Sequence, residues 1–174
     1  MTVLRIRRYP DPVLRARCAP VGTVDEEVRR LLDDMLETMY AAPGIGLAAP
    51  QVGVTRRLVV VDVSEEKNAP LRLVDPEIVW RSEETEVAEE GCLSLPDIYG
   101  EVRRARAIRL RYRDETGALR ELAAEGLLAR CLQHELDHLD GVLFIDHLSS
   151  VRRNLLLRRY RKGQRAKKAE PARA

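Results

Sequence analysis

The chain has 174 residues, of which 45% are hydrophobic and 33% charged, so it is long enough for one domain with a substantial core. No apolar stretch approaches the ~20 residues needed to cross a bilayer, and Met1 to Pro10 contains no apolar segment of signal-peptide length. The three cysteines (Cys18, Cys92 and Cys131) are an odd number, which argues against a disulfide framework. We therefore expect a cytoplasmic protein.

The net charge of +2 conceals an asymmetry along the chain. Residues 151–174 contain ten Lys or Arg and one acid, Glu170, for a charge of +9; residues 1–150 contain 20 basic and 27 acidic residues, for −7. A basic tail on an acidic body could contact nucleic acid or a ribonucleoprotein surface. Solvated charge on a C-terminal helix is the simpler alternative, and the sequence leaves both open.

The first predicted element is a helix from about Val24 to Tyr40, because apolar residues repeat there at helical spacing. Thr23, followed three residues later by Glu26, predicts a capping box at its start. Ala42-Pro43-Gly44 should end it, because proline cannot continue the backbone bonding.

The middle of the chain predicts strands and the last third predicts helices. The strand candidates are Leu58 to Val63, Leu71 to Trp80 with a break near Pro76, a weaker Glu83 to Ala88, and a hairpin of Ala107 to Arg113 with Leu119 to Ala124. A helix should run from about Gly126 to Leu139, and another from about Ser149 or Ser150 into the tail. This order predicts a single α+β domain, with residues 1–150 as the main body and 151–174 as an attached basic helix.

The strongest chemical signal is His134-Glu135-Leu136-Asp137-His138, an H-E-x-x-H on the predicted second helix. Residues i and i+4 lie on one helix face, so both imidazoles can reach one metal ion. Glu135 can then act as general base on a water held by that ion.

The third metal ligand does not follow either familiar zinc-protease pattern. A metzincin would need a third histidine where Phe144 stands, and no glutamate occupies the region where a thermolysin-like ligand would lie. Cys131 is on the helix face of His134, but the metal would lie about 7–8 Å away along the axis, too far for its side chain. Cys92, which follows Glu90-Gly91, is the better candidate.

One thiolate and two imidazoles leave a fourth position for water, which is typical of a catalytic site. A closed structural site would need a fourth side chain, and the remaining imidazole, His147, has no helical register with the pair.

Three motifs, in order, resemble those of bacterial peptide deformylases: Gly44-Ile45-Gly46-Leu47-Ala48-Ala49-Pro50-Gln51, Glu90-Gly91-Cys92-Leu93-Ser94 and Gln133-His134-Glu135-Leu136-Asp137-His138. The resemblance implies antiparallel or mixed β-sheets packed around a central metal-binding helix, with a C-terminal helix. It implies removal of the N-formyl group from the formyl-methionine of new polypeptides, with release of formate. It also implies one divalent metal ion, Fe²⁺ as the working ion, with Zn²⁺, Ni²⁺ or Co²⁺ possible in the purified protein.

The resemblance assigns roles to the remaining site residues. A metal-bound hydroxide would attack the formyl carbon, with Glu135 taking up the proton and returning it to the leaving amine. The Gln51 amide and the Leu93 backbone N–H would stabilise the developing oxyanion.

The substrate groove is expected along Ile45, Gly46, Glu90 and Gly91. Ile45 and Gly46 would present backbone groups to an antiparallel peptide, as in strand addition. Arg104 matches a recurrent family arginine and could pair with Glu90 to brace the ligand loop. Residues 97–103 match no fixed family pattern.

Two other functions remain open from the sequence: another metal-dependent amidase or peptidase, and a non-catalytic metal-binding module. The expected partners are N-formyl-methionyl nascent peptides and, through the tail, the ribosome surface. A membrane or DNA partner is not expected.

Overall fold

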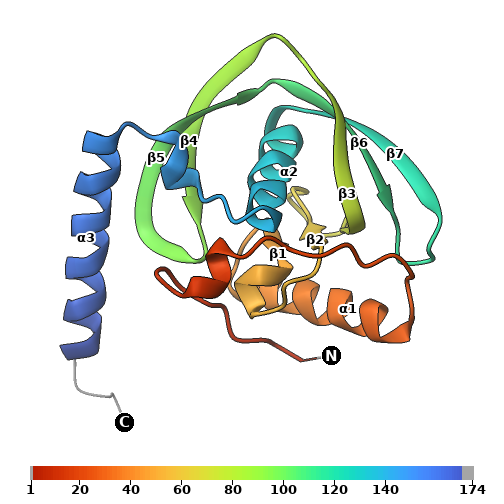
Figure 1. Ribbon diagram of the computed structural model, residues 1–174, viewed down its shortest axis with the longest axis horizontal. Coiled ribbons are helices and arrows are strands. Elements are labelled where there is room, and N and C mark those ends of the chain that lie inside the picture. The colour runs from red at the N-terminus through yellow and green to blue at the C-terminus, as the bar shows by residue number, and fades with distance from the viewer. Residues whose placement is uncertain (1, 170–174) are drawn as a thin grey trace.

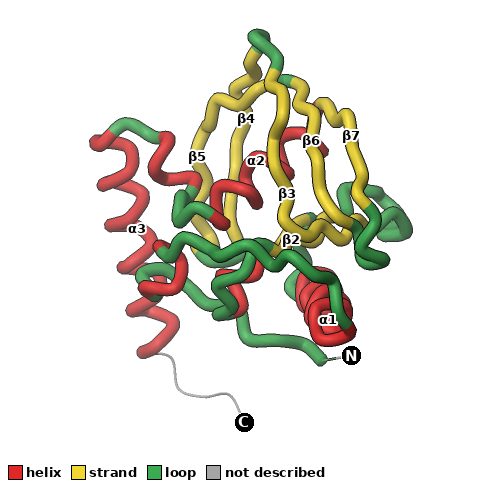
Figure 2. The backbone as a smooth tube through the Cα atoms, turned by 45° about the vertical axis from the view of Figure 1, so that its right-hand side comes forward, coloured by secondary structure: helices red, strands yellow, loops and turns green. Residues whose placement is uncertain are grey.

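The computed structural model describes residues 2–169 as two antiparallel sheets on either side of helix α2, Gly126–Leu139 (Figures 1 and 2). The larger sheet has the order β1-β2-β3-β6-β7, and the smaller is the hairpin β4-β5. The strands are β1 Gly46–Ala48, β2 Leu58–Val61, β3 Leu71–Arg81, β4 Thr85–Cys92, β5 Leu95–Ala105, β6 Ala107–Arg113 and β7 Leu119–Glu125. The predicted α+β class with antiparallel sheets and a C-terminal helix is confirmed.

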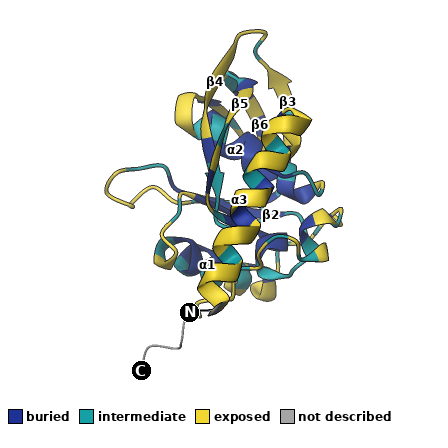
Figure 3. Cartoon of the chain, turned by 90° about the vertical axis from the view of Figure 1, so that its left-hand side faces the viewer, coloured by how far each residue is buried: buried dark blue, intermediate teal, exposed yellow. Residues whose placement is uncertain are grey.

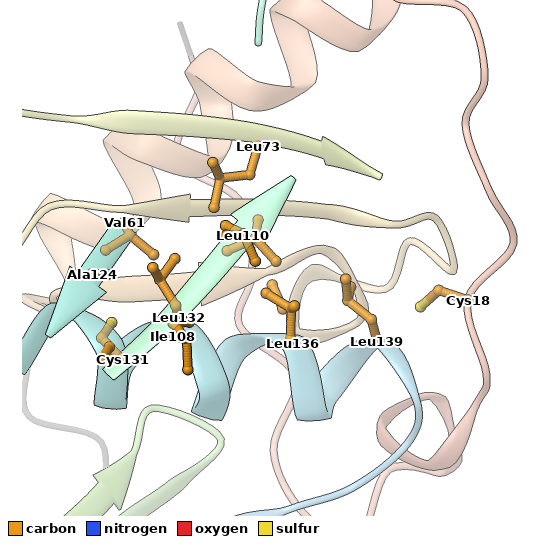
Figure 4. Packing of buried hydrophobic residues seen from close by; sticks show 13 residues of the cluster. Cys18, Val61, Leu73, Ile108, Leu110, Ala124, Cys131, Leu132, Leu136 and Leu139 are labelled. Carbon is orange, nitrogen blue, oxygen red and sulfur yellow. The ribbon is translucent and has the colours of Figure 1, made fainter. Parts of the chain in front are cut away.

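Helix α2 is held by the apolar face that it turns toward the larger sheet. Leu132, Leu136 and Leu139 pack against side chains of β2, β3, β6 and β7, such as Leu73 and Leu110 (Figure 4). Each such leucine contributes about 1.5–3 kcal/mol when it is fully buried. The opposite side of α2 is thereby turned toward the β4-β5 hairpin.

Helix α1, Glu26–Ala41, packs on β1 and β2 through a separate apolar cluster. The expected end of the helix is confirmed, since Ala42 is its C-cap. The predicted Thr23 cap is wrong: Asp25 is the N-cap, and its side chain accepts the Val28 N–H at 2.9 Å. A carboxylate one turn before that N–H also complements the helix dipole, which explains why Asp25 takes the position.

The predicted strands are present, with differences at their ends. Near Pro76, where a break was expected, β3 is continuous, but its register with β6 shifts between Val74 and Glu77, and Asp75 has a φ of 50°. Strand β4 continues beyond the predicted Ala88 to Cys92, and β5 was not predicted at all. These two differences matter, because the β4-β5 hairpin carries one wall of the site.

Three short 3₁₀ helices and a long C-terminal helix complete the fold: η1 Pro12–Arg15, η2 Ala49–Val52, η3 Phe144–His147 and α3 Ser150–Ala169. Helix α3 stands beside β5 and is exposed over most of its length (Figures 1 and 3). Leu157 and Tyr160 are its buried anchors, and the Tyr160 hydroxyl donates to the Tyr9 carbonyl at 2.9 Å. Among residues 2–169, no helix has the length and apolarity required to cross a membrane.

Candidate metal centre and active site

Three side chains from two elements form the candidate metal centre. Cys92 ends β4, and His134 and His138 lie one turn apart on α2. One ligand atom from each lies within 4.8 Å of the others, and Cys92 Sγ is 3.4 Å from His138 Nε2. A thiolate with two imidazoles suits zinc, iron and related divalent ions. The structure therefore groups the three ligands that the sequence predicted.

The two histidines are prepared for metal binding in different ways. His134 Nδ1 lies 2.9 Å from Glu90 Oε1, which leaves Nε2 for the metal, a common arrangement of carboxylate, histidine and metal. Burial, together with the neighbouring His134, holds the pKa of His138 well below its ordinary value, so its imidazole is neutral. His138 Nδ1 is buried and has no hydrogen-bond partner within residues 2–169.

Glu90 is ionised although it is buried. Burial alone would raise its pKa, but hydrogen bonds from Arg104 and His134 lower it below the ordinary value. Arg104 donates through Nε and Nη2 to the two carboxylate oxygens, both at 2.9 Å. The predicted Glu90–Arg104 pair is confirmed, and it holds the carboxylate that orients His134.

The same arginine connects the site to two residues for which the sequence suggested no role. Arg104 Nη1 donates to Asp137 Oδ2 at 2.6 Å, and His147 Nε2 lies 2.8 Å from the same oxygen. Asp137 is inside the H-E-x-x-H motif, so its helical position was visible, but nothing local marks His147 as its neighbour.

Glu135 has the environment of a proton acceptor. Its side chain is buried, and Oε2 has no hydrogen-bond partner in the part of the chain that the structure describes. Burial raises the pKa of Glu135 to about 7, with the Glu90 charge adding to it and His134 opposing it. A carboxyl with a pKa near neutrality is suited to general acid–base catalysis.

Strand β1 runs close to this carboxyl. A Cβ at Gly46 would lie 2.8 Å from Cys131 Sγ and 2.9 Å from both Cγ and Oε1 of Glu135. Only glycine therefore fits here without displacing a side chain. β1 is also one of the two edge strands of its sheet.

The hydrogen bonds between β1 and β2 show which backbone groups of β1 point away from the sheet. The Asp62 N–H donates to the Ile45 carbonyl at 2.8 Å, so Ile45 faces β2. Because bonded and non-bonded pairs alternate in antiparallel sheets, Gly46 and Ala48 direct their backbone groups to the free edge. The Ala48 N–H is taken by Gln51 Oε1 at 2.9 Å, which leaves Gly46 as the open position.

The Gln51 side chain is buried, and its amide is fixed in orientation. Because Oε1 accepts from Ala48, Nε2 is turned toward the β4-β5 turn, 3.2 Å from Ser94 Oγ and 3.6 Å from Cys92 Sγ. Leu93 lies in that turn, and its side chain fills the space that a Cβ at Gly44 would need, at 2.8 Å. Gln51 and Leu93 thus lie beside Cys92.

The other cysteines lie apart from the ligand group. Cys131 belongs to the hydrophobic cluster under the larger sheet, where its thiol is 3.7 Å from the Ile45 carbonyl (Figure 4). Cys18 is buried at the other end of that cluster. The structure thus brings Cys92, and neither of the other two cysteines, to the histidine pair. A Cβ at Gly91 would lie 2.7 Å from the Tyr99 ring, so this close approach requires glycine.

A groove of about 1450 Å³ opens onto the ligand group. Its walls include Ile45, Gly46, Tyr99, Leu127 and Glu135. The volume exceeds the roughly 300–1,000 Å³ of small-molecule sites, so the groove has room for several residues of an extended peptide.

A Cys-His-His ligand set with a poised glutamate, beside an open strand edge, defines a metal-dependent hydrolase. The polypeptide deformylase family model matches residues 3–154. The chain is 53% identical over 172 residues to a peptide deformylase of Rhizobium meliloti (strain 1021), covering 98% of this chain and 99% of that protein. It is 54% identical over 168 residues to that of Xylella fastidiosa (strain M12), covering 95% and 98%.

Solved structures give the same result. A peptide deformylase of Legionella pneumophila is similar with a TM-score of 0.92 and 43% identity, over 98% of this chain and 100% of that one. The enzyme of Ehrlichia chaffeensis in complex with actinonin gives 0.90 and 41%, over 95% and 99%. The chain belongs to the peptide deformylase family, a family of enzymes that remove N-formyl groups.

Proposed function

We propose that this chain removes the formyl group from N-formyl-methionyl nascent polypeptides and releases formate. The observation that carries the proposal is the grouping of Cys92, His134 and His138 within 4.8 Å. Beside this group lies a buried glutamate, Glu135, whose Oε2 has no hydrogen-bond partner within residues 2–169. Family membership supplies the reaction.

The catalytic role of each residue follows from the position of its side chain. A divalent ion on the three ligands would lower the pKa of a coordinated water and polarise the formyl carbonyl. Glu135 accepts the proton of the attacking water and delivers it to the leaving amine nitrogen, a role that its pKa of about 7 allows in both directions. Gln51 Nε2 and the Leu93 N–H, both beside Cys92, donate to the formyl oxygen as its charge develops.

The substrate backbone adds to the free edge of β1. Gly46 has its N–H and C=O directed to that edge, while the Ile45 side chain, 44% exposed, forms part of the groove wall. Main-chain pairing of this kind supplies affinity without reading side chains. On the other side of the groove, Gly91 of β4 would allow the peptide to approach closely. Glu90, the preceding residue, lies behind this wall and orients His134.

The test is formate release from a formyl-Met-Ala-Ser peptide under anaerobic conditions, with the unformylated peptide as the matched control. We expect stoichiometric formate and a free N-terminal amine from the first peptide and no cleavage of the second. Internal cleavage of both would identify a general peptidase. Bound metal without cleavage of either peptide would identify a non-catalytic module.

Fe²⁺ is the proposed working ion, by family resemblance. The ligand set itself does not select iron, because thiolate and imidazole bind Zn²⁺, Ni²⁺ and Co²⁺ as well. Two measurements test this assignment: the metal content of protein prepared without oxygen, and kcat of the protein loaded with each ion in turn.

We also propose that the basic C-terminal segment attached to the catalytic body, residues 151–174, docks the enzyme on the ribosome. Three exposed arginines of α3 line a common groove: Arg158, Arg161 and Arg165. Ribosomal RNA would contact them mainly through phosphates, so binding should fall steeply with salt. This location, with three free cysteines in the chain, also supports a cytoplasmic protein.

The structure limits how the docking proposal can be tested. Truncation after Leu157 would remove the buried Tyr160 and its bond to Tyr9. Neutralising Arg158, Arg161 and Arg165 to Gln avoids this, with an equal loss of charge at the exposed Arg81, Arg109 and Arg111 of β3 and β6 as control. Docking requires weaker ribosome co-sedimentation at low salt for the α3 variant alone, with unchanged turnover of the free peptide. Equal co-sedimentation of both variants and the unaltered protein would refute it.

A further inference from the structure

Glu90 accepts four hydrogen bonds, and one donor belongs to a residue not yet assigned any role. Arg104 supplies two of the bonds and His134 the third, each at 2.9 Å. The fourth comes from Arg130 Nη1, which is 2.7 Å from Glu90 Oε2. An ionised carboxylate has about four lone-pair sites, so Arg130 completes the set.

Arg130 occupies a distinctive place in the fold. It precedes His134 by four residues on α2, and i and i+4 side chains share one helix face. Its guanidinium also donates to two backbone carbonyls, of Val102 on β5 and of Glu86 on β4, both at 2.8 Å. One side chain therefore joins the helix that carries two metal ligands to both strands of the hairpin that carries the third.

The Arg130 contacts indicate which part of the metal centre they hold in place. Cys92 follows Glu90 by two residues on β4, so the position of its Sγ relative to the imidazoles depends on how the hairpin sits against α2. The Arg130 side chain is only 11% exposed, and its partner Glu90 only 4%. A buried planar guanidinium that donates to three acceptors through two of its nitrogens holds those partners in one geometry, which a flexible ammonium cannot do.

Arg130 also affects the charge that His134 experiences. Glu90 is shared between two guanidinium groups, which withdraw negative charge from the oxygen facing His134 Nδ1. Partners behind a metal-binding histidine set its orientation and its basicity. We infer that Arg130 is a positioning residue of the metal centre, which sets the Cys92–His134 geometry through Glu90. The inference depends on the proposed metal site but not on the identity of the substrate.

The test compares Arg130→Met and Arg130→Lys with the unaltered protein in the Co²⁺-substituted form. Arg106→Gln is the matched control, because Arg106 pairs with Glu84 and Glu86 on the same hairpin but is 57% exposed. We expect Arg130→Met to shift the cobalt absorption bands and to weaken metal binding by about 10–100-fold in chelator competition. kcat should fall more than KM rises. Arg130→Lys should fall between Arg130→Met and the unaltered protein, and Arg106→Gln should match the latter.

Unfolding of the metal-free variants separates positioning from simple stabilisation. A loss of stability in Arg130→Met with an unchanged cobalt spectrum and unchanged metal affinity would overturn the inference, as would equal shifts in Arg106→Gln. If the unaltered protein itself binds no metal, the proposed function fails and not merely this inference.

Discussion

Replacing Gly46 by alanine tests the contact between the edge strand β1 and the Glu135 carboxyl, the proposed general base. The new Cβ would lie 2.9 Å from Glu135 Cγ and Oε1 and 2.8 Å from Cys131 Sγ. Carbon–carbon contacts are optimal at about 3.5–4.0 Å, so the Glu135 side chain must retreat by about 0.6–1 Å. A displacement of about 1 Å at a reacting group can lower the rate by about 100-fold. We therefore expect kcat to fall by about 10–100-fold.

The variant should keep its metal, because the three atoms nearest to the new methyl group belong to Cys131 and Glu135 and not to a ligand. Overpacking should lower the free energy of unfolding by about 1–3 kcal/mol. Adding Cys131→Ala removes one of the two clashes, so the double variant should regain stability but not kcat. The assay is formate release, with metal content measured on the same samples.

Two results would contradict this reasoning. Unchanged kcat in metal-loaded Gly46→Ala would mean that Glu135 tolerates the displacement. Full recovery of kcat in the double variant would mean that Cys131, rather than Glu135, transmits the effect.

Four further outcomes are expected. Glu135→Gln should retain metal but lose nearly all formate release, because it removes a base and not a ligand; loss of metal would contradict the assignment. Cys92→Ala and His138→Ala should lose both metal and activity, whereas Cys131→Ala should keep both, as metal analysis and the formate assay will show. Because the folded pKa of Glu135 is raised from 4.5 to about 7, its stabilising contribution in metal-free protein is present at low pH. This contribution is lost between about pH 4.5 and 7, by up to about 3 kcal/mol; urea unfolding should show this loss in the unaltered protein and not in Glu135→Gln. Air exposure should inactivate the iron form while zinc protein remains unaffected, and an iron form indifferent to oxygen would refute that assignment.

The metal ligands could be predicted because two of them depend only on local helix geometry. His134 and His138 are i and i+4 on one face, and this spacing is independent of the rest of the fold. Excluding Cys131 required only the helix rise. Cys92 could be assigned because few alternatives remained among three cysteines.

Strand β5 was missed for a physical reason. Its buried positions are Leu95, Ile98, Val102 and Arg104, with a half-buried Gly100 between Ile98 and Val102. A glycine and a charged residue on the inward face obscure the alternation expected of a strand. Arg104 can be buried there only because Glu90 and Asp137 neutralise it, and both come from other elements.

The Asp25 cap and the role of Arg130 show two different limits. Asp25 was available in the sequence, but Thr23 with Glu26 matched a stronger motif, and the motif was misleading. Arg130 carries no local signal, because its significance comes from partners at positions 86, 90 and 102. Only the three-dimensional structure brings these together.

The β1 edge has a further consequence for the behaviour of the protein in a crowded solution. An unpaired strand edge is normally a template for aggregation, and proteins protect such edges by keeping them short or covered. Here β1 is three residues long, and the Gln51 side chain accepts the Ala48 N–H. Only the backbone N–H and C=O of Gly46 therefore remain open at this edge. That is too little backbone for a foreign strand to pair with along its length. We expect so little exposed backbone at β1 to keep this edge from promoting self-association.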